Sequence, residues 1–250
     1  MKTTIKITSI LILSFLMLFN FGVSGVSGQK TKSPVRILLF TGGHDFDREA
    51  FDVLKKSLPD MTVVEVTHPN ALAMLRPANR SSFDVILLYD LPTVINEQEK
   101  QDFLDCLKEK KGLVVMHHAF ASYPEWPEFQ RIMGGRYHLK EWTDSKGIVQ
   151  PASTYLHDVQ FHVKVADRKH PVTKDINDFD ILDETYGLCT VNPGVHVLLT
   201  TDEPTSNSSI TWAHRYGKTK VVTTLLGHDN HAWSNPAFAK LLIQAIRWVR

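Results

Sequence analysis

The chain has 250 residues, of which 43% are hydrophobic and 22% are charged, and its formal net charge is +1. This length suits one large α/β domain, and a nearly neutral chain gives no basis for binding nucleic acid or an anionic membrane. With only two cysteines, Cys106 and Cys189, the fold does not depend on a disulfide framework, and the sequence leaves open whether the two pair.

The first 28 residues have the organisation of a secretory signal peptide. Lys2 and Lys6 give a basic start, residues 10–21 are apolar, and Val26-Ser-Gly28 supplies the small residues that precede a cleavage site. We therefore expect cleavage after Gly28, export to the periplasm or out of the cell, and one mature domain over residues 29–250.

The signal peptide holds two of the 28 basic residues and no acidic residue, so the mature chain has 26 basic and 27 acidic residues and a net charge of −1. The apolar segment is shorter than the ~20 residues of a membrane span, so an uncleaved anchor is the less favoured alternative, and no integral membrane domain is expected after cleavage.

The first half of the mature chain alternates buried strands with helices. Apolar runs at 35–40, 62–67, 83–89 and 112–116 predict strands. Asn96, with Glu99 three residues later, predicts a capping box at the start of a helix that contains Cys106 as a packed thiol. The alternation predicts a three-layer α/β fold of flavodoxin type, in which helices cover both faces of a mostly parallel sheet.

The second half is less regular. A short helix is predicted at 128–133, and strands are predicted at 160–165, 195–200, 210–215 and 220–226. Residues 183–186 are expected in a long loop before the second of these strands. Asn235-Pro236 predicts the start of a last helix that ends near Val249.

Histidines follow three of the predicted strands. His44 follows the first strand, His117 and His118 follow the fourth, and His228 with Asp229 follows the last. Ligands of open α/β sheets bind outside the carboxyl ends of the parallel strands. We therefore expect these imidazoles to converge at one edge of the sheet.

Imidazoles beside a carboxylate suit two kinds of chemistry, and the sequence leaves both open. One is general acid–base catalysis, because histidine titrates near neutral pH and a carboxylate orients its ring. The other is a divalent metal site, such as a Zn²⁺ site. The candidate catalytic residues are His117, His228 and Glu184. The candidate metal ligands are His44, His117, His228 and Glu184. The candidate substrate-binding residues are His44, His118, Tyr186, Asp229 and Trp233.

Other catalytic classes lack their motifs. The sequence has no Gly-x-Ser-x-Gly elbow, no Gly-rich phosphate loop and no cysteine directly after a predicted buried strand. These observations argue against a serine or cysteine nucleophile.

Motifs along nearly the whole mature chain resemble those of the ThuA-like (trehalose utilisation) family. The matching stretches are Val35 to His44, Phe83 to Asp90, Gly112 to Ala119, Gly134 to Tyr137, His170 to Thr173, Asp183 to Tyr186 and Trp212 to Trp248. The resemblance implies the fold of class I glutamine amidotransferases, in which an elbow after a strand like 112–116 bears the catalytic cysteine. This chain has His117 there instead, so thiol catalysis is not implied.

The resemblance also implies a role in carbohydrate metabolism, with keto-sugars made by partner dehydrogenases. We therefore expect an exported enzyme that acts on a small glycoside or keto-glycoside by elimination or hydrolysis. The alternatives are a non-catalytic carbohydrate-binding protein on the same fold and a metal-dependent hydrolase of unrelated substrates. The sequence leaves the oligomeric state open, a homodimer included.

Overall fold

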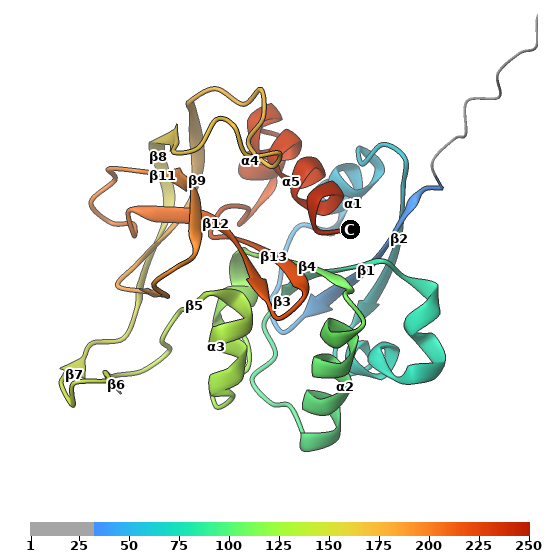
Figure 1. Ribbon diagram of the computed structural model, residues 1–250. Helices are drawn as coiled ribbons and strands as arrows, with labels where there is room; N and C mark the ends of the chain where they lie inside the picture. The colour runs from blue at the N-terminus through green and yellow to red at the C-terminus, as the bar shows by residue number, and fades with distance from the viewer. Residues whose placement is uncertain (1–32) are drawn as a thin grey trace, which may run out of the picture. The chain divides into compact units, whose positions relative to one another are not determined.

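A nine-stranded sheet runs through the computed structural model, which describes residues 33–250, in the order β2-β1-β3-β4-β13-β12-β11-β8-β9 (Figure 1). Five neighbouring strands are parallel: β2 (Met61–Thr67), β1 (Val35–Gly42), β3 (Val85–Asp90), β4 (Gly112–Met116) and β13 (Thr219–Thr224). The other four continue the sheet in antiparallel pairs: β12 (Ser209–Tyr216), β11 (His196–Thr200), β8 (Thr154–Val165) and β9 (Phe179–Gly187). The expected signal peptide lies outside the described residues.

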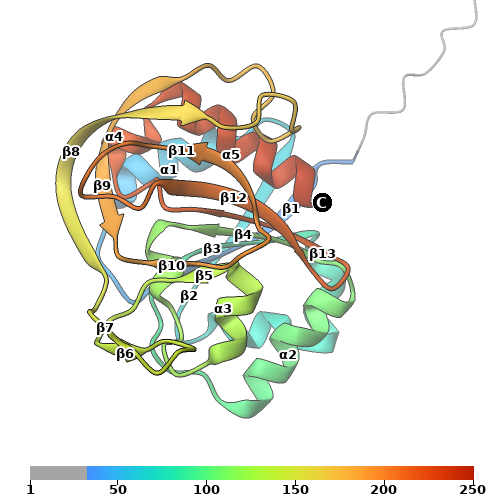
Figure 2. The same cartoon turned by 60° about the vertical axis from the view of Figure 1, so that its left-hand side comes forward.

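Helices cover both faces of the parallel half. One face carries α1 (Arg48–Lys56), α4 (Asn230–Trp233) and α5 (Pro236–Val249), and the other carries α2 (Glu97–Lys108) and α3 (Pro127–Met133) (Figures 1 and 2). Two short pairs, β5 (Gly135–Arg136) with β10 (Thr190–Val191) and β6 (Trp142–Thr143) with β7 (Val149–Gln150), lie outside the main sheet. The predicted three-layer fold with a mostly parallel sheet is confirmed.

Local sequence accounts for the best-predicted elements. Every residue of β3 and β4 is buried, as expected of strands covered on both faces. Asn96 Oδ1 accepts from the Glu99 amide while Glu99 Oε2 accepts from the Asn96 amide, both at 2.9 Å, which confirms the capping box. Gly112 is needed where β4 begins, because a Cβ there would lie 2.6 Å from the carbonyl oxygen of Val249 at the end of α5.

The expected loop at 183–186 is wrong, because these residues belong to β9. The strand pairs with β8, with Tyr186 opposite Tyr155 and Asp183 opposite Val159. Its centre is polar and yet buried, so its apolar periodicity is too weak to predict a strand. The strand predicted at 160–165 also begins earlier, at Thr154, in a stretch that is exposed along its first residues.

The connection between β2 and β3 contains no α-helix in the described chain. It consists of two 3-10 helices, η1 (Ala71–Leu75) and η2 (Pro77–Ser82), so the strict strand–helix alternation does not hold there. Arg76 separates the two, and Pro77 begins the second. The buried Leu72 and Leu75 are three residues apart, which matches the repeat of a 3-10 helix.

Residues 33–250 pack as one compact unit. Within them, no helix has both the length and the apolar character that a bilayer crossing requires.

Candidate functional site

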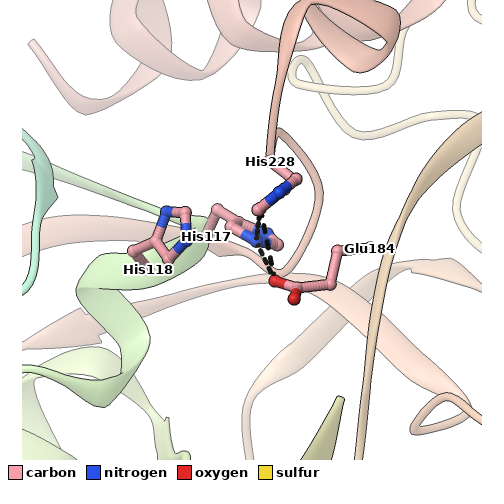
Figure 3. Close-up of side chains that lie close together, drawn as sticks. All are labelled: His117, His118, Glu184 and His228. Atoms are coloured by element: carbon pink, nitrogen blue, oxygen red, sulfur yellow. Dashed lines mark hydrogen bonds and ion pairs between the residues drawn. The ribbon is translucent and has the colours of Figure 1, made fainter. Parts of the chain in front are cut away.

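The site lies at the carboxyl edge of the parallel strands, where three segments meet (Figure 3). His117 and His118 open the 3-10 helix η3 (His117–Ala121) directly after β4. His228 lies four residues beyond the end of β13, and Glu184 extends from β9. The expected convergence of strand-end histidines is therefore seen in the structure, with a carboxylate from the antiparallel half of the sheet.

His117 occupies a sharp turn from strand to helix. Its φ is +50°, in the left-handed region that non-glycine residues seldom adopt, and its side chain is fully buried. Nδ1 lies 2.6 Å from the carbonyl oxygen of Leu225. Because a carbonyl can only accept, Nδ1 must carry a proton and donate it, and Nε2 then presents a lone pair unless the ring is an imidazolium.

Three polar groups surround Nε2 of His117. Glu184 Oε2 lies at 2.8 Å, the Tyr186 hydroxyl at 3.0 Å and His228 Nδ1 at 3.2 Å. His228 Nδ1 is also 3.4 Å from Glu184 Oε2. A carboxylate oxygen and a neutral imidazole nitrogen are both acceptors, so a proton or another cation has to lie between them.

The charges in this cluster favour an ionised Glu184 carboxylate and a cationic His228 imidazole. Burial alone would raise the pKa of Glu184, but the hydrogen bonds and charges of His117 and His228 outweigh burial and hold it well below its usual range. Burial likewise opposes the charged form of His228, but Glu184 outweighs it and raises the pKa of His228. The ionised Glu184 and the cationic form of His228 therefore stabilise one another.

His118 and His44 form the next layer towards solvent. Their rings stack with centroids 3.9 Å apart, and His44 also packs edge-on against Tyr89. Burial lowers the pKa of both imidazoles, and the neighbouring His117 lowers each further. Nδ1 of His118 is buried and has no hydrogen-bond partner among the described residues.

Asp183 fixes the backbone that carries His228. Its carboxylate accepts from the amides of Gly227 at 2.8 Å and His228 at 3.0 Å, and from the amide of Glu184 at 2.9 Å. Burial raises the pKa of Asp183, while His117 and these amides oppose the rise. One carboxylate thus ties the loop after β13 to β9.

A β-bulge brings in His157, which sequence reasoning missed. Thr185 pairs with Leu156 and Asp183 pairs with Val159, so two residues of β8, His157 and Asp158, lie opposite the single residue Glu184 of β9. Bulges turn side chains away from the regular alternation and recur beside active sites. Here His157 Nδ1 comes within 3.1 Å of Glu184 Oε1, although the imidazole remains half exposed. An irregular register has no signature in hydrophobic alternation, so no sequence signal located this residue.

A cavity of about 270 Å³ opens in front of the cluster. This volume is slightly below the range of about 300–1,000 Å³ that is usual for small-molecule pockets. Its lining consists of His44, Leu91, His118, Ala121, Tyr137, Leu139, Tyr155, His157, Glu184 and Tyr186. The wall is aromatic and imidazole-rich, with one carboxylate.

Four predicted site residues do not line this cavity, namely His228, His117, Trp233 and Asp229. His117 is covered by its partners. The Trp233 indole is buried against Phe51 and donates to the carbonyl of Gly227 at 2.9 Å. Asp229 caps α4 by accepting from the His231 amide. Packing and capping account for the last two, whose polar or aromatic character alone suggested a binding role.

Four side chains offer donor atoms that could hold a metal ion. One atom from each of His117, His118, Glu184 and His228 lies within 4.8 Å of all the others. His44, expected as a ligand, is not in this group, and His118 takes its place. Three imidazoles and a carboxylate suit a borderline transition metal better than Mg²⁺ or Ca²⁺, which prefer oxygen.

Comparison with known proteins identifies relatives of the whole domain. The family model described as ThuA, trehalose utilisation, matches residues 36–249. A ThuA-like protein from Parabacteroides merdae is similar in structure, with a TM-score of 0.72 and 21% identity, over 86% of this chain and 90% of that one. A ThuA-like protein from Bacteroides uniformis has a TM-score of 0.65 and 20% identity, over 90% of this chain and 95% of that one.

A more distant likeness is to a glutamine amidotransferase from Thermotoga maritima, with a TM-score of 0.47 and 11% identity, over 86% of this chain and 97% of that one. No curated protein matches the chain.

Proposed function

The chain belongs to the ThuA family, described as trehalose utilisation, and we propose that it is an exported enzyme that cleaves neutral keto-glycosides by elimination and hydration. The family links the chain to carbohydrate metabolism. The reaction, the substrate and the export are our proposal.

One observation carries the proposed chemistry: Glu184 lies between the half-exposed imidazole of His157 and the imidazoles of His117 and His228. Its Oε1 contacts His157, and its Oε2 contacts His117 and His228. A carboxylate that accepts from Nδ1–H fixes the tautomer of an imidazole and leaves Nε2 as a base. His157 lines the cavity, so its Nε2 is our choice for the group that takes a proton from substrate.

The lining of the cavity supports an uncharged sugar. Of its ten described residues, none is arginine or lysine, the side chains that usually bind phosphates and carboxylates. Tyr137, Tyr155 and Tyr186 instead give the wall an aromatic surface that suits a polar neutral ligand. The hydroxyls of Tyr137 and Tyr186 are held by Ser153 and His117.

The proposed reaction begins at the carbon next to a ring ketone. The ketone acidifies this C–H bond, and His157 takes the proton as the electron pair moves into an enolate. The enolate expels the glycosidic oxygen from the adjacent carbon, and the His157 imidazolium returns its proton to that oxygen. Water then adds across the resulting enone, with hydroxyl at the former glycosidic carbon and hydrogen at the former acidic carbon, so the net change is hydrolysis. Positive charge at this cluster, carried by protonated His228 or by another cation bound there, stabilises the enolate. Since His117 is fully buried, we assign it to positioning Glu184 and His228 and not to direct contact with substrate.

The test is an assay of aglycone release from 3-keto-glycosides and from the parent glycosides. We expect release only from the keto forms, and we expect His157→Gln to lower kcat by about 100-fold or more, as for a lost general base. His162→Gln is the matched control, because His162 is an exposed histidine on the same strand that pairs with Asp180. An inert wild-type protein would overturn the reaction, and a fully active His157→Gln variant would overturn the assignment of the base.

A non-catalytic carbohydrate-binding protein is the second candidate. The observation that favours it is the absence of a thiol at the elbow, where His117 stands, together with three tyrosines on the cavity wall. Calorimetry would support it if parent sugars bind and no sugar, keto form included, is turned over.

A further inference from the structure

We propose that His117, His118, His228 and Glu184 hold one divalent transition metal ion of the zinc type. The role of the ion as a Lewis acid on the ketone rests on the proposed function, whereas its binding does not. The four donors come from η3, the loop after β13 and strand β9, so the folded domain assembles the site (Figure 3).

The first argument is the orientation of His117. Metal-binding histidines usually donate their second ring N–H to a carbonyl or carboxylate, which fixes the lone pair towards the ion. The Nδ1 of His117 donates to Leu225 in this way, so Nε2 faces Glu184 and His228. A cation among these atoms removes the conflict between two facing acceptors.

The second argument is the unpartnered nitrogen of His118. Buried polar atoms nearly always have a hydrogen-bond partner, and an exception calls for an explanation such as an ion. Nδ1 of His118 is such an exception among residues 33–250, and this imidazole offers a donor atom to the same cluster. An ion bound through Nδ1 of His118 would give this nitrogen its missing partner and would also accept the lone pair of His117 Nε2.

The third argument is preorganisation around the donors. Asp183 holds the backbone of His228 through two amides, and His157 contacts the Glu184 oxygen that is not shared with His117. Supporting contacts of this kind orient ligands and strengthen metal binding. His118 and Glu184 also line the cavity, so a substrate there would lie beside the ion.

The distances between the donor atoms show how the side chains must move when a metal ion binds. Neighbouring ligands of a tetrahedral zinc ion, each about 2.1 Å from it, lie ~3.4 Å apart. His228 Nδ1 and Glu184 Oε2 are already 3.4 Å apart, whereas His117 Nε2 and Glu184 Oε2 are 2.8 Å apart. A rotation of the Glu184 carboxylate would open the shorter contact by about 0.6 Å. The His118 donor, which lies within 4.8 Å of the other three, would also have to close around the ion.

The rival explanation is a proton in place of the ion, with His117 as a buried imidazolium paired with Glu184. Metal content separates the two. The full chain without a His tag would be stripped with chelator, reloaded with Zn²⁺ and analysed by elemental mass spectrometry, calorimetry and the visible spectrum of the Co²⁺ form. We expect one ion per chain, Co²⁺ bands of a low-symmetry N₃O site, and at least tenfold weaker binding in His118→Ala and Glu184→Gln.

His162→Gln again serves as the control and should bind like the wild type, with circular dichroism confirming that each variant is folded. A folded wild type that takes up no stoichiometric metal overturns the proposal, as do folded His118→Ala and Glu184→Gln variants that bind with wild-type affinity. One bound ion without turnover of any keto-glycoside supports the metal site and overturns the proposed function. Turnover of keto-glycosides by a protein that binds no metal supports the proposed function and overturns the metal site.

Discussion

Asp183 and Glu184 are adjacent carboxylates on β9 with separate tasks. Glu184 contacts imidazole rings, and Asp183 contacts backbone amides on both sides of the junction between β9 and the loop after β13. Asp183 is 3% exposed, so water cannot replace these partners. We therefore regard Asp183 as a positioning residue for His228.

Asp183→Asn should destabilise the protein and displace His228. The amide group would turn a donor towards a backbone N–H, and an unsatisfied buried hydrogen bond costs about 1–3 kcal/mol of the free energy of unfolding. Urea denaturation measures this loss, and weaker binding of Zn²⁺ would report the displacement of His228. Asp180→Asn on the same strand is the control, because Asp180 is largely exposed and should change stability little. Equal stability of the two variants would argue against the positioning role.

Residues that follow apolar strands were predictable, and residues placed by irregular backbone were not. His44, His117 and His228 each come directly after a buried run, so the parallel-sheet rule brought them to one edge. The type of its side chain makes Glu184 a candidate, although the sequence pattern predicts a loop where the structure has strand β9. His157 depends on a bulge, and bulges arise from pairing between strands that a linear pattern does not contain.

At the scale of elements, Gly134 joins α3 to the sheet. It ends the helix at φ +76°, and a Cβ there would lie 2.8 Å from Trp212 Nε1 and 2.9 Å from both His214 Cε1 and Val195 Cγ1. Trp212 is fully buried and donates to the carbonyl of Met133 at 2.9 Å. The helix can approach β12 this closely only because the residue has no side chain.

Gly134→Ala should therefore be much more damaging than Gly147→Ala. Gly147 has nearly the same φ, +80°, but nothing lies within 4 Å of its added Cβ. Both variants bear the backbone strain of about 1 kcal/mol, and only Gly134→Ala adds overpacking of about 1–3 kcal/mol. Thermal and urea unfolding of the pair measure the difference. Matching losses would mean that α3 adjusts freely against β12.

How accurately the sequence predicts each strand depends on whether one or both faces of that strand are buried. Strands β1, β3 and β4 are buried at every residue except Arg36, and helices cover both of their faces, so their apolar runs stand out in the sequence. The outer strands β8 and β9 mix buried polar with exposed apolar residues, and their alternation is lost. The site lies at the junction of the two halves, so its parallel side was predictable and its antiparallel side was not.

At the scale of the whole molecule, an exported chain would keep two reduced thiols in an oxidising compartment. Cys106 and Cys189 are both free, which answers the question that the sequence left open. Cys106 is fully buried in α2, and burial raises the pKa of each thiol to about 12. Since the thiolate is the reactive form, both residues should resist oxidation while the domain is folded.

Intact mass spectrometry of the protein recovered from the periplasm of a bacterial host that expresses the full-length gene tests both export and this thiol state. We expect a chain that begins at Gln29, because the small residues before it suit signal peptidase. The native protein should react slowly with iodoacetamide, and the unfolded protein should gain two carbamidomethyl groups without any reductant, one for each free cysteine. A mass that retains residues 1–28 would contradict cleavage after Gly28.

Alkylation that requires a reductant would mean that Cys106 and Cys189 pair in the exported protein. In that case the packing of α2, which encloses Cys106, would have to open during oxidation.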